Sequence, residues 1–273
     1  MNLHLQNVPP RNGYLWVRHG LKVLQRKPMA LTSMFGLFLL CSLLLMLLPA
    51  LGPLLVLAAL PLVSLGFMLA THMVLQAQTP TMAVFAQPLQ LTPQRRRSQL
   101  ILGAAYAAAT VLVMMLSDWV DGGAFGALQD ALQQGEAGAA ATKLALEDPR
   151  LFWGAVTRLG LTALLSVPFW HAPALVHWAG QGPMQALFSS TLGVWRNKSA
   201  FALSALAWAS LVMLCSTALA LPLSLLGLGV LLPLVAMVVG GIISTAFYCS
   251  LYFTFIDCFM FGAPKDVLDE PRA

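Results

Sequence analysis

Charged and titratable side chains are rare in the apolar segments of this 273-residue chain, so the few found there are the first candidates for chemistry. Arg158 stands about two turns inside a long apolar segment. A charge at that depth is costly unless it pairs, reaches the headgroups or faces a water-filled cavity. We therefore expect Arg158 to border a polar cavity. The alternatives are a side chain that extends to the outer headgroups, or an ion pair with Asp118, Asp121 or Asp148.

Two histidines follow in the segment FWHAPALVHW, residues 169–178. Pro168 precedes this segment and Pro173 lies within it, and because each proline removes a helix hydrogen bond, together they favour a kink. Irregular backbone inside a membrane is tolerated where it is buried in protein or lines a cavity. On an unbroken helix His171 and His177 would lie roughly 240° apart and share no ligand. Interfacial anchoring is their favoured role, and metal or haem ligation is the alternative.

Asp257 closes the last apolar segment and is the only acidic residue near the inner ends of the predicted helices. The favoured interpretation is a salt bridge to one of the basic residues on that side. Basic clusters beside membrane helices also bind anionic headgroups, which makes these residues the candidate headgroup-binding set. They are Arg95, Arg96, Arg97, Arg196 and Lys198.

Common hydrolytic and phosphoryl-transfer machinery has no visible parts in this sequence. The chain has no G-x-S-x-G, no phosphate-binding loop and no pair of buried carboxylates, so no catalytic residue is assigned. Its four cysteines lack the paired spacing of a zinc site or a redox pair and are expected to be small apolar fillers. We expect no metal and no cofactor. The basic clusters indicate contact with lipid headgroups, not with nucleic acid.

The elements that position these residues are long apolar segments. Because 59% of the residues are hydrophobic and only 9% are charged, most of the chain must be solvated by lipid. Each segment has about the length that crosses the hydrocarbon as a helix, and none alternates with the period of two that a membrane barrel requires. The fold class is therefore an all-α membrane bundle. The six predicted transmembrane segments are residues 29–48, 51–75, 100–117, 151–178, 200–222 and 229–256.

The distribution of lysine and arginine predicts the orientation, because positive flanks resist translocation. Twelve of the fifteen basic residues fall on one side of the six segments, and that side is predicted to be the cytoplasm. Both termini then lie in the cytoplasm, and the chain spans a bacterial inner membrane. We predict a single membrane domain over residues 1–273. It comprises a basic amphipathic segment at 1–28, an acidic outer loop at 118–150 and a cytoplasmic tail at 257–273.

A weak internal repeat divides the chain into three units. A shift of 103 residues lays the stretch 83–85 over 186–188 and Arg95 over Lys198. In each unit a short apolar-faced stretch leads to a basic cluster and then to a pair of membrane segments. Val17, Leu21 and Leu24 form such a stripe near the N-terminus, and Leu187, Phe188 and Trp195 form another. We expect three hairpins, each preceded by an amphipathic helix at the membrane surface; ordinary solvated loops are the alternative.

Three short motifs carry a family resemblance: FWHAP at 169–173, QALF at 185–188 and WRNK at 195–198. With the basic run before the first segment, they resemble a family of proteobacterial inner-membrane proteins of unknown function, over nearly the whole chain. The resemblance implies a location and an architecture but no substrate or catalytic residue. The threefold layout also looks like the membrane regions attached to some glycerophosphodiester phosphodiesterases, whose catalytic domain is absent here.

These observations favour a non-enzymatic membrane protein that handles a lipid or a small amphipathic solute, or that assists an envelope complex. The predicted partners are membrane lipids, with anionic headgroups on the cytoplasmic side. A membrane enzyme that uses Arg158, His171 or His177 on a lipid-like substrate is the second hypothesis. A channel or transporter for a polar solute is the third. A lipid-filled lateral groove would favour the first hypothesis, and a continuous polar path would favour the third.

Overall fold

The computed structural model describes residues 4–259, apart from the side chains of residues 136 and 137, and over this range it contains helices and no strands. Six of the helical spans in this range are long and apolar enough to cross a membrane, which confirms the predicted all-α polytopic bundle. The spans pair into three hairpins. These are α2 (Pro28–Leu45) with α3 (Leu51–Leu75), α4 (Pro93–Asp121) with α7 (Pro149–Phe169), and α10 (Lys198–Leu225) with α11 (Leu232–Phe259).

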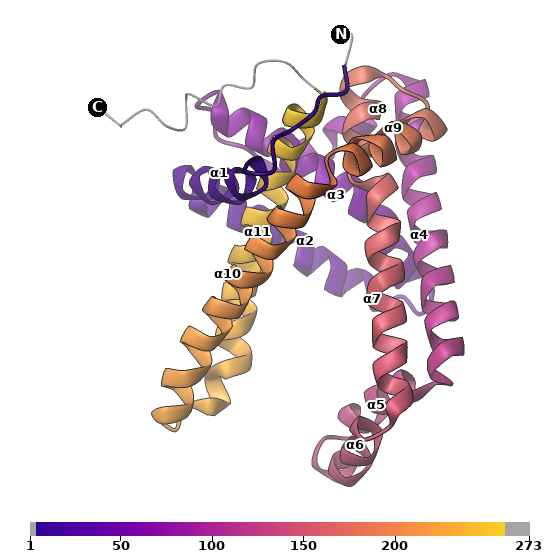
Figure 1. Ribbon diagram of the computed structural model, residues 1–273, viewed down its shortest axis with the longest axis vertical. Helices are drawn as coiled ribbons and strands as arrows, with labels where there is room; N and C mark the ends of the chain where they lie inside the picture. Colours follow the sequence, from indigo (N-terminus) through magenta and orange to yellow (C-terminus); the bar gives the residue numbers. More distant parts are fainter. Residues whose placement is uncertain (1–3, 260–273) are drawn as a thin grey trace.

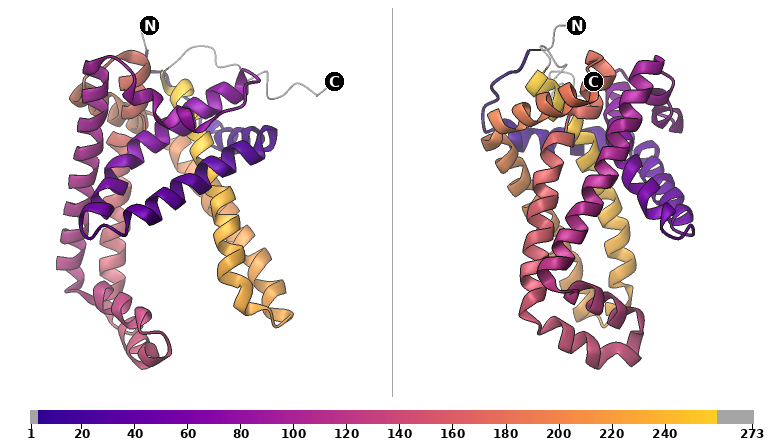
Figure 2. Two further views of the ribbon diagram at one scale, coloured as in Figure 1. Left: turned by 180° about the vertical axis from the view of Figure 1, so that it is seen from behind. Right: turned by 90° about the vertical axis from the view of Figure 1, so that its right-hand side faces the viewer.

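The three hairpins converge at one end of the molecule and diverge toward the other (Figure 1). α1 (Asn12–Arg26), α8 (Ala172–Ala179) and α9 (Pro183–Arg196) lie across the convergent end. α5 (Ala124–Gln133) and α6 (Ala139–Leu146) lie at the far end of the α4–α7 hairpin. Figure 2 shows that the α2–α3 hairpin slants away from the other two. The molecule therefore resembles a three-legged stand.

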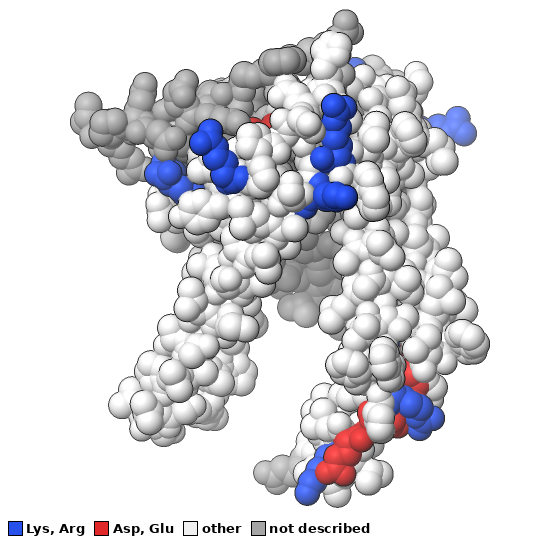
Figure 3. All heavy atoms as spheres, viewed as in Figure 1, with Lys and Arg blue, Asp and Glu red and all other residues white. Residues whose placement is uncertain are grey.

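Charge separates along the long axis of this stand. Blue lysine and arginine side chains gather at the convergent end in Figure 3, which we call the basic end. The basic residues of α1 and of the starts of α4 and α10 lie there. Acidic side chains appear mainly at the far end of the α4–α7 hairpin, together with a few basic ones. The tip of the α10–α11 hairpin carries neither in this view.

The protein core sits at the basic end. Trp16, Phe67, Phe253 and Phe255 are among its largest fully buried side chains. Nearly every residue of α11 from Thr245 onward is buried, whereas the first half of that helix is largely exposed. The diverging parts of the hairpins expose leucine, valine and methionine side chains, as lipid-facing helices do. Protein contacts thus hold the convergent end, and the legs extend into the hydrocarbon.

α1 packs directly on α10 and α11. Gly13 lies against the backbone of α10 at Ala200, and Gly20 lies against α11 at Ala246, so any larger side chain at either position would overlap the neighbouring helix. Val17 and Leu24 are buried in the protein core. The expectation that these two side chains insert into lipid is therefore wrong. Amphipathicity alone does not distinguish a stripe that faces lipid from one that faces protein.

The other two surface segments differ from each other. Before α4 the chain forms two short 3-10 turns, η1 (Met82–Phe85) and η2 (Gln87–Leu89), where an amphipathic helix was expected. Prolines at 80, 88 and 93 prevent a continuous α-helix there. α9 does form a helix, and Met184, Phe188 and Trp195 are exposed on one side of it. That exposed apolar face fits a helix in the headgroup plane.

The fourth apolar span is broken in two. α7 ends at Phe169 and α8 begins at Ala172, with Pro173 in its first turn. The kink expected from Pro168 and Pro173 is thus a complete interruption of the helix. The expected outer loop is also more helical than its composition suggested, since α5, the 3-10 turn η3 (Gly135–Gly138) and α6 occupy it. A 3-10 turn, η4 (Gly229–Leu231), leads into α11.

Candidate functional site

Asp257 holds α1 against α11. Its Oδ2 atom accepts hydrogen bonds from Asn12 Nδ2 at 2.7 Å and from Trp16 Nε1 at 2.8 Å. The carboxylate is 7% exposed, so these donors stabilise a charge that is largely removed from water. Sequence reasoning favoured a partner in the basic clusters and did not consider α1. The observed contacts make Asp257 an anchor for the N-terminal helix.

His171 lies at the break between α7 and α8 and is completely buried. Its Nε2 atom lies 3.1 Å from the Thr254 hydroxyl, and its backbone N–H donates to Ser190 Oγ at 3.0 Å. The rings of Phe201 and Phe259 pack edge-on against the imidazole. These contacts satisfy the interrupted backbone and fix the break to α9 and α11, as irregular backbone within a membrane requires.

His177 stands at the other end of α8, near a predicted headgroup ligand. Arg95 Nη1 donates a hydrogen bond to the His177 backbone carbonyl at 3.1 Å, and the guanidinium lies beside Gly180. Arg95 thus caps the C-terminal end of α8, where a positive charge is favourable. The other four predicted headgroup ligands are exposed at the basic end: Arg96, Arg97, Arg196 and Lys198.

Two residues at the basic end form structural contacts that sequence reasoning missed. Gln99 is fully buried and donates to the Pro173 carbonyl at 2.9 Å, which ties α4 to α8. Asn197 accepts from the Val8 backbone N–H at 2.8 Å and donates to the Gly193 carbonyl at 3.0 Å. A buried amide gives little signal when it sits in a sequence next to a basic cluster. The WRNK motif nevertheless contains this asparagine.

Arg158 lies far from both histidines. Its Nη2 atom is 2.6 Å from Asp118 Oδ1, and its guanidinium lies over the Phe125 ring at 3.9 Å. The thirteen positions from Arg158 to His171 correspond to about 20 Å of helix. Of the three acids considered as ion-pair partners, Asp118 is the one it contacts. Arg158 therefore joins α4, α5 and α7 at the far end, and the four polar candidates do not form one site.

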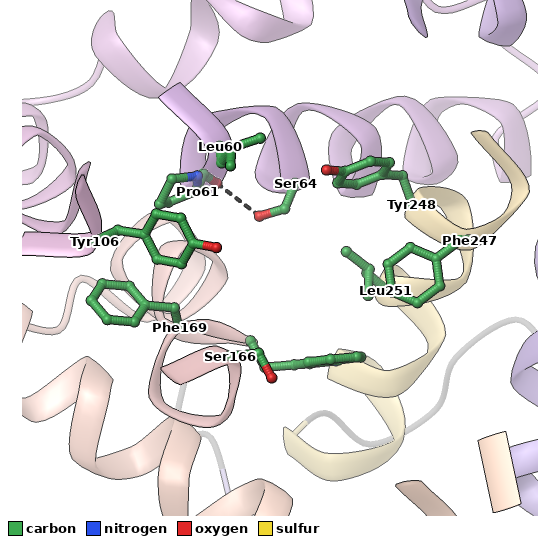
Figure 4. A pocket seen from close by; sticks show the side chains of 10 residues that line it. Leu60, Pro61, Ser64, Tyr106, Ser166, Phe169, Phe247, Tyr248 and Leu251 are labelled. Atoms are coloured by element: carbon green, nitrogen blue, oxygen red, sulfur yellow. Dashed lines mark hydrogen bonds between the residues drawn. The ribbon is translucent and has the colours of Figure 1, made fainter. Parts of the chain in front are cut away.

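A cavity of about 150 Å³ lies where the hairpins meet, and we call it the apex cavity. It brings together residues from α3, α4, α7 and α11 (Figure 4). Trp170, just after α7, also lines it. Arg158, His171 and His177 are not among its lining residues, so the cavity expected between Arg158 and the kinked stretch is not the one observed here. The lining residues are Leu60, Pro61, Ser64, Tyr106, Ser166, Phe169, Trp170, Phe247, Tyr248 and Leu251.

The lining of the apex cavity is aromatic and carries hydroxyl groups but no charge. Figure 4 shows the hydroxyls of Ser64 and Tyr106 directed into the cavity and that of Tyr248 directed toward Ser64. These three residues lie near the middle of α3, α4 and α11. The signal in the sequence was therefore a tyrosine or serine in mid-segment. This signal could not be recognised, because a single amino-acid sequence does not show that these positions converge in the fold.

Two further cavities lie within single hairpins. One of about 400 Å³ separates α10 from α11 near Cys215 and Gly240, and one of about 250 Å³ lies beside Phe38 and Phe85. Apolar side chains form most of the wall of both. In a bilayer, spaces of this kind at the surface of helices are filled by lipid chains. The apex cavity differs from them because four helices from all three hairpins contribute to it.

The fold and these cavities define a polytopic membrane protein with an uncharged cavity between its three hairpins. The chain is 32% identical over 270 residues to the probable inner membrane protein BTH_II0599 of Burkholderia thailandensis, and the match covers 96% of this chain and 97% of the relative. It therefore belongs to the same inner-membrane protein family, as the resemblance implied. No family model matches the chain. No solved structure matches it either.

Proposed function

We propose that this protein binds a single lipid-soluble amphipathic molecule in the membrane without transforming it chemically. The apex cavity carries this proposal, because all three hairpins contribute to it. Three of its lining residues, Ser64, Tyr106 and Tyr248, lie near the middle of membrane-spanning helices. Five aromatic residues line it together with Leu60 and Pro61 of α3 and Leu251 of α11, and apolar burial favours a lipid-like ligand. The α4–α7 and α10–α11 hairpins stand apart toward the far end (Figure 3), so an apolar chain can extend between them.

The basic end is proposed to face the cytoplasm and to contact anionic headgroups. Arg96, Arg97, Arg196 and Lys198 are exposed there, and exposed cations beside membrane helices attract anionic lipids. A reporter fused after Arg97 should therefore report the cytoplasm, and one fused near Gln134 should report the opposite side. A cytoplasmic signal from the Gln134 fusion would contradict this orientation.

Filling the apex cavity tests the binding proposal. Ser64→Phe places a ring in the cavity and should lower the amount of lipid that remains bound through detergent purification by at least about tenfold, because a close-packed ring leaves no space for a ligand. The measurement is mass spectrometry of lipid extracts and of the intact protein. We expect the unsubstituted protein to retain one lipid molecule per chain and the Ser64→Phe variant to lose this specific retention.

Ser33→Phe is the matched control. Ser33 lies in α2, is exposed, and donates to the carbonyl three residues earlier, as Ser64 does. This variant should retain the lipid. Equal retention in Ser64→Phe and Ser33→Phe would show that the apex cavity is not the binding site. Turnover of an added lipid by purified protein would instead support the membrane-enzyme hypothesis.

A further inference from the structure

The hydrogen-bond donors of the apex cavity that remain free for a ligand are all of one kind. Ser64 Oγ already donates to the Pro61 carbonyl at 2.8 Å, and Ser166 Oγ donates to the Ala163 carbonyl at 2.7 Å. Trp170 Nε1 donates to Thr254 Oγ1 at 3.2 Å, on α11. No described residue accepts a hydrogen bond from the Tyr248 hydroxyl, and the Tyr106 hydroxyl is directed into the cavity (Figure 4). The donors left for a ligand are therefore phenols.

A phenol without a hydrogen-bond partner among the described residues, in a largely apolar cavity, favours a ligand that carries an acceptor oxygen. An acceptor placed beside the Tyr248 hydroxyl gains a hydrogen bond, and apolar surroundings strengthen that bond. That acceptor should be uncharged, because the lining contains no cation to pair with it and an unpaired charge among membrane-spanning helices is disfavoured. A phosphate or carboxylate headgroup is thereby excluded from the cavity. A carbonyl oxygen satisfies both conditions.

The walls and the size of the cavity favour a flat ring. Tyr106 and Phe169 pack edge-on with centroids 5.1 Å apart, and Trp170 and Phe247 pack edge-on at 6.0 Å, so aromatic faces and edges surround the space. A cavity of about 150 Å³ in another protein core binds benzene. Aromatic rings favour offset or edge-on packing with further rings. One six-membered ring therefore fits against these aromatic walls.

We propose that the apex cavity binds the ring of a lipid-soluble quinone. A ring carbonyl accepts hydrogen bonds from Tyr248 and Tyr106, and the apolar tail leaves between the diverging hairpins. This inference rests on the proposed lipid-binding function and names the chemical class of the lipid. It involves no electron transfer, since the protein supplies binding groups only.

The test uses decylubiquinone as the ligand and the purified full-length chain in detergent. Quinones quench tryptophan fluorescence, and Trp170 lines the cavity. Tyr248→Phe removes one hydroxyl and should weaken decylubiquinone binding about three- to tenfold, the equivalent of one hydrogen bond. Tyr14→Phe makes the same chemical change on the exposed surface of α1 and should leave the affinity unchanged. Equal affinity in Tyr248→Phe and the unsubstituted protein would overturn the quinone assignment.

Competition separates this inference from the proposal on which it rests. Dioctanoylglycerol and dioctanoylphosphatidylglycerol should fail to displace decylubiquinone. If dioctanoylglycerol displaces it, or binds where decylubiquinone does not, the ligand is a neutral glyceride; the quinone assignment is then wrong and lipid binding stands. If Ser64→Phe retains lipid and binds decylubiquinone as the unsubstituted protein does, both the quinone assignment and the proposed binding site are wrong.

Discussion

The α4–α7 and α10–α11 hairpins span similar lengths, yet they are held together differently. The far end of α4–α7 is closed by the Asp118–Arg158 ion pair and by Gly154, which lets Asp121 of α4 approach α7 closely. α5 packs against both of its helices. In α10–α11, beyond Trp208 and Phe247, no described side chains form a hydrogen bond or ion pair between the helices, and a cavity of about 400 Å³ separates them.

The difference indicates that hydropathy reports whether a segment crosses the membrane but not what closes a hairpin. Polar pairs and close glycine contacts fix the spacing of α4 and α7 regardless of the lipid around them. The spacing of α10 and α11 away from the core depends on apolar contacts that lipid chains can replace. We expect the second hairpin to adjust more readily when a ligand enters the apex cavity, to which both hairpins contribute.

The largest expected effect comes from one methyl group placed in each hairpin. A Cβ at Gly154 would overlap the Asp121 side chain, whereas a Cβ at Gly240 meets nothing within 4 Å. Gly154→Ala should lower the free energy of unfolding by about 1 to 3 kcal/mol through overpacking. Gly240→Ala should raise it by about 0.5 to 1 kcal/mol, since alanine loses less backbone entropy than glycine.

Unfolding in mixed micelles with increasing dodecyl sulfate measures both variants. Helical content by circular dichroism confirms that each variant starts folded. If Gly154→Ala is as stable as Gly240→Ala, the close contact in α4–α7 does not set its spacing, and the contrast between the two hairpins is lost.

Much of the architecture could be predicted from the sequence, because it depends on local patterns. Five of the six predicted segments correspond to single helices. The remaining one, residues 151–178, is interrupted where the prolines at 168 and 173 predicted a kink. The three acids named as alternative partners of Arg158 lie near the two ends of the outer loop, and Asp118 is one of them. Run length, proline chemistry and charge placement act over neighbouring residues, so one sequence reveals them.

The site could not be predicted, because it depends on long-range convergence. Tyr106 and Tyr248 are 142 positions apart in the numbering, and only the packing of four helices brings them to one cavity. The same holds for Asp257, whose partners Asn12 and Trp16 lie at the opposite end of the chain. The sequence interpretation concentrated on charged residues, because a charge is costly in lipid. The cavity is lined by hydroxyl and aromatic side chains, which are not conspicuous there.

The smallest expected effect concerns Arg158 itself and decides whether its role is structural. The side chain is 23% exposed and that of Asp118 is 57% exposed, so water screens the pair and its coupling should be only about 0.5 to 1 kcal/mol. Arg158 Nε is buried without a hydrogen-bond partner within the described residues, so leucine would also remove an unsatisfied donor.

A double-mutant cycle of Arg158→Leu and Asp118→Leu, followed by the same micelle unfolding, measures the coupling. Retention of lipid should be unchanged in all three variants, because Arg158 does not line the apex cavity. Loss of lipid from Arg158→Leu at unaltered stability would instead place Arg158 in the binding site and make the closure of α4–α7 part of the function.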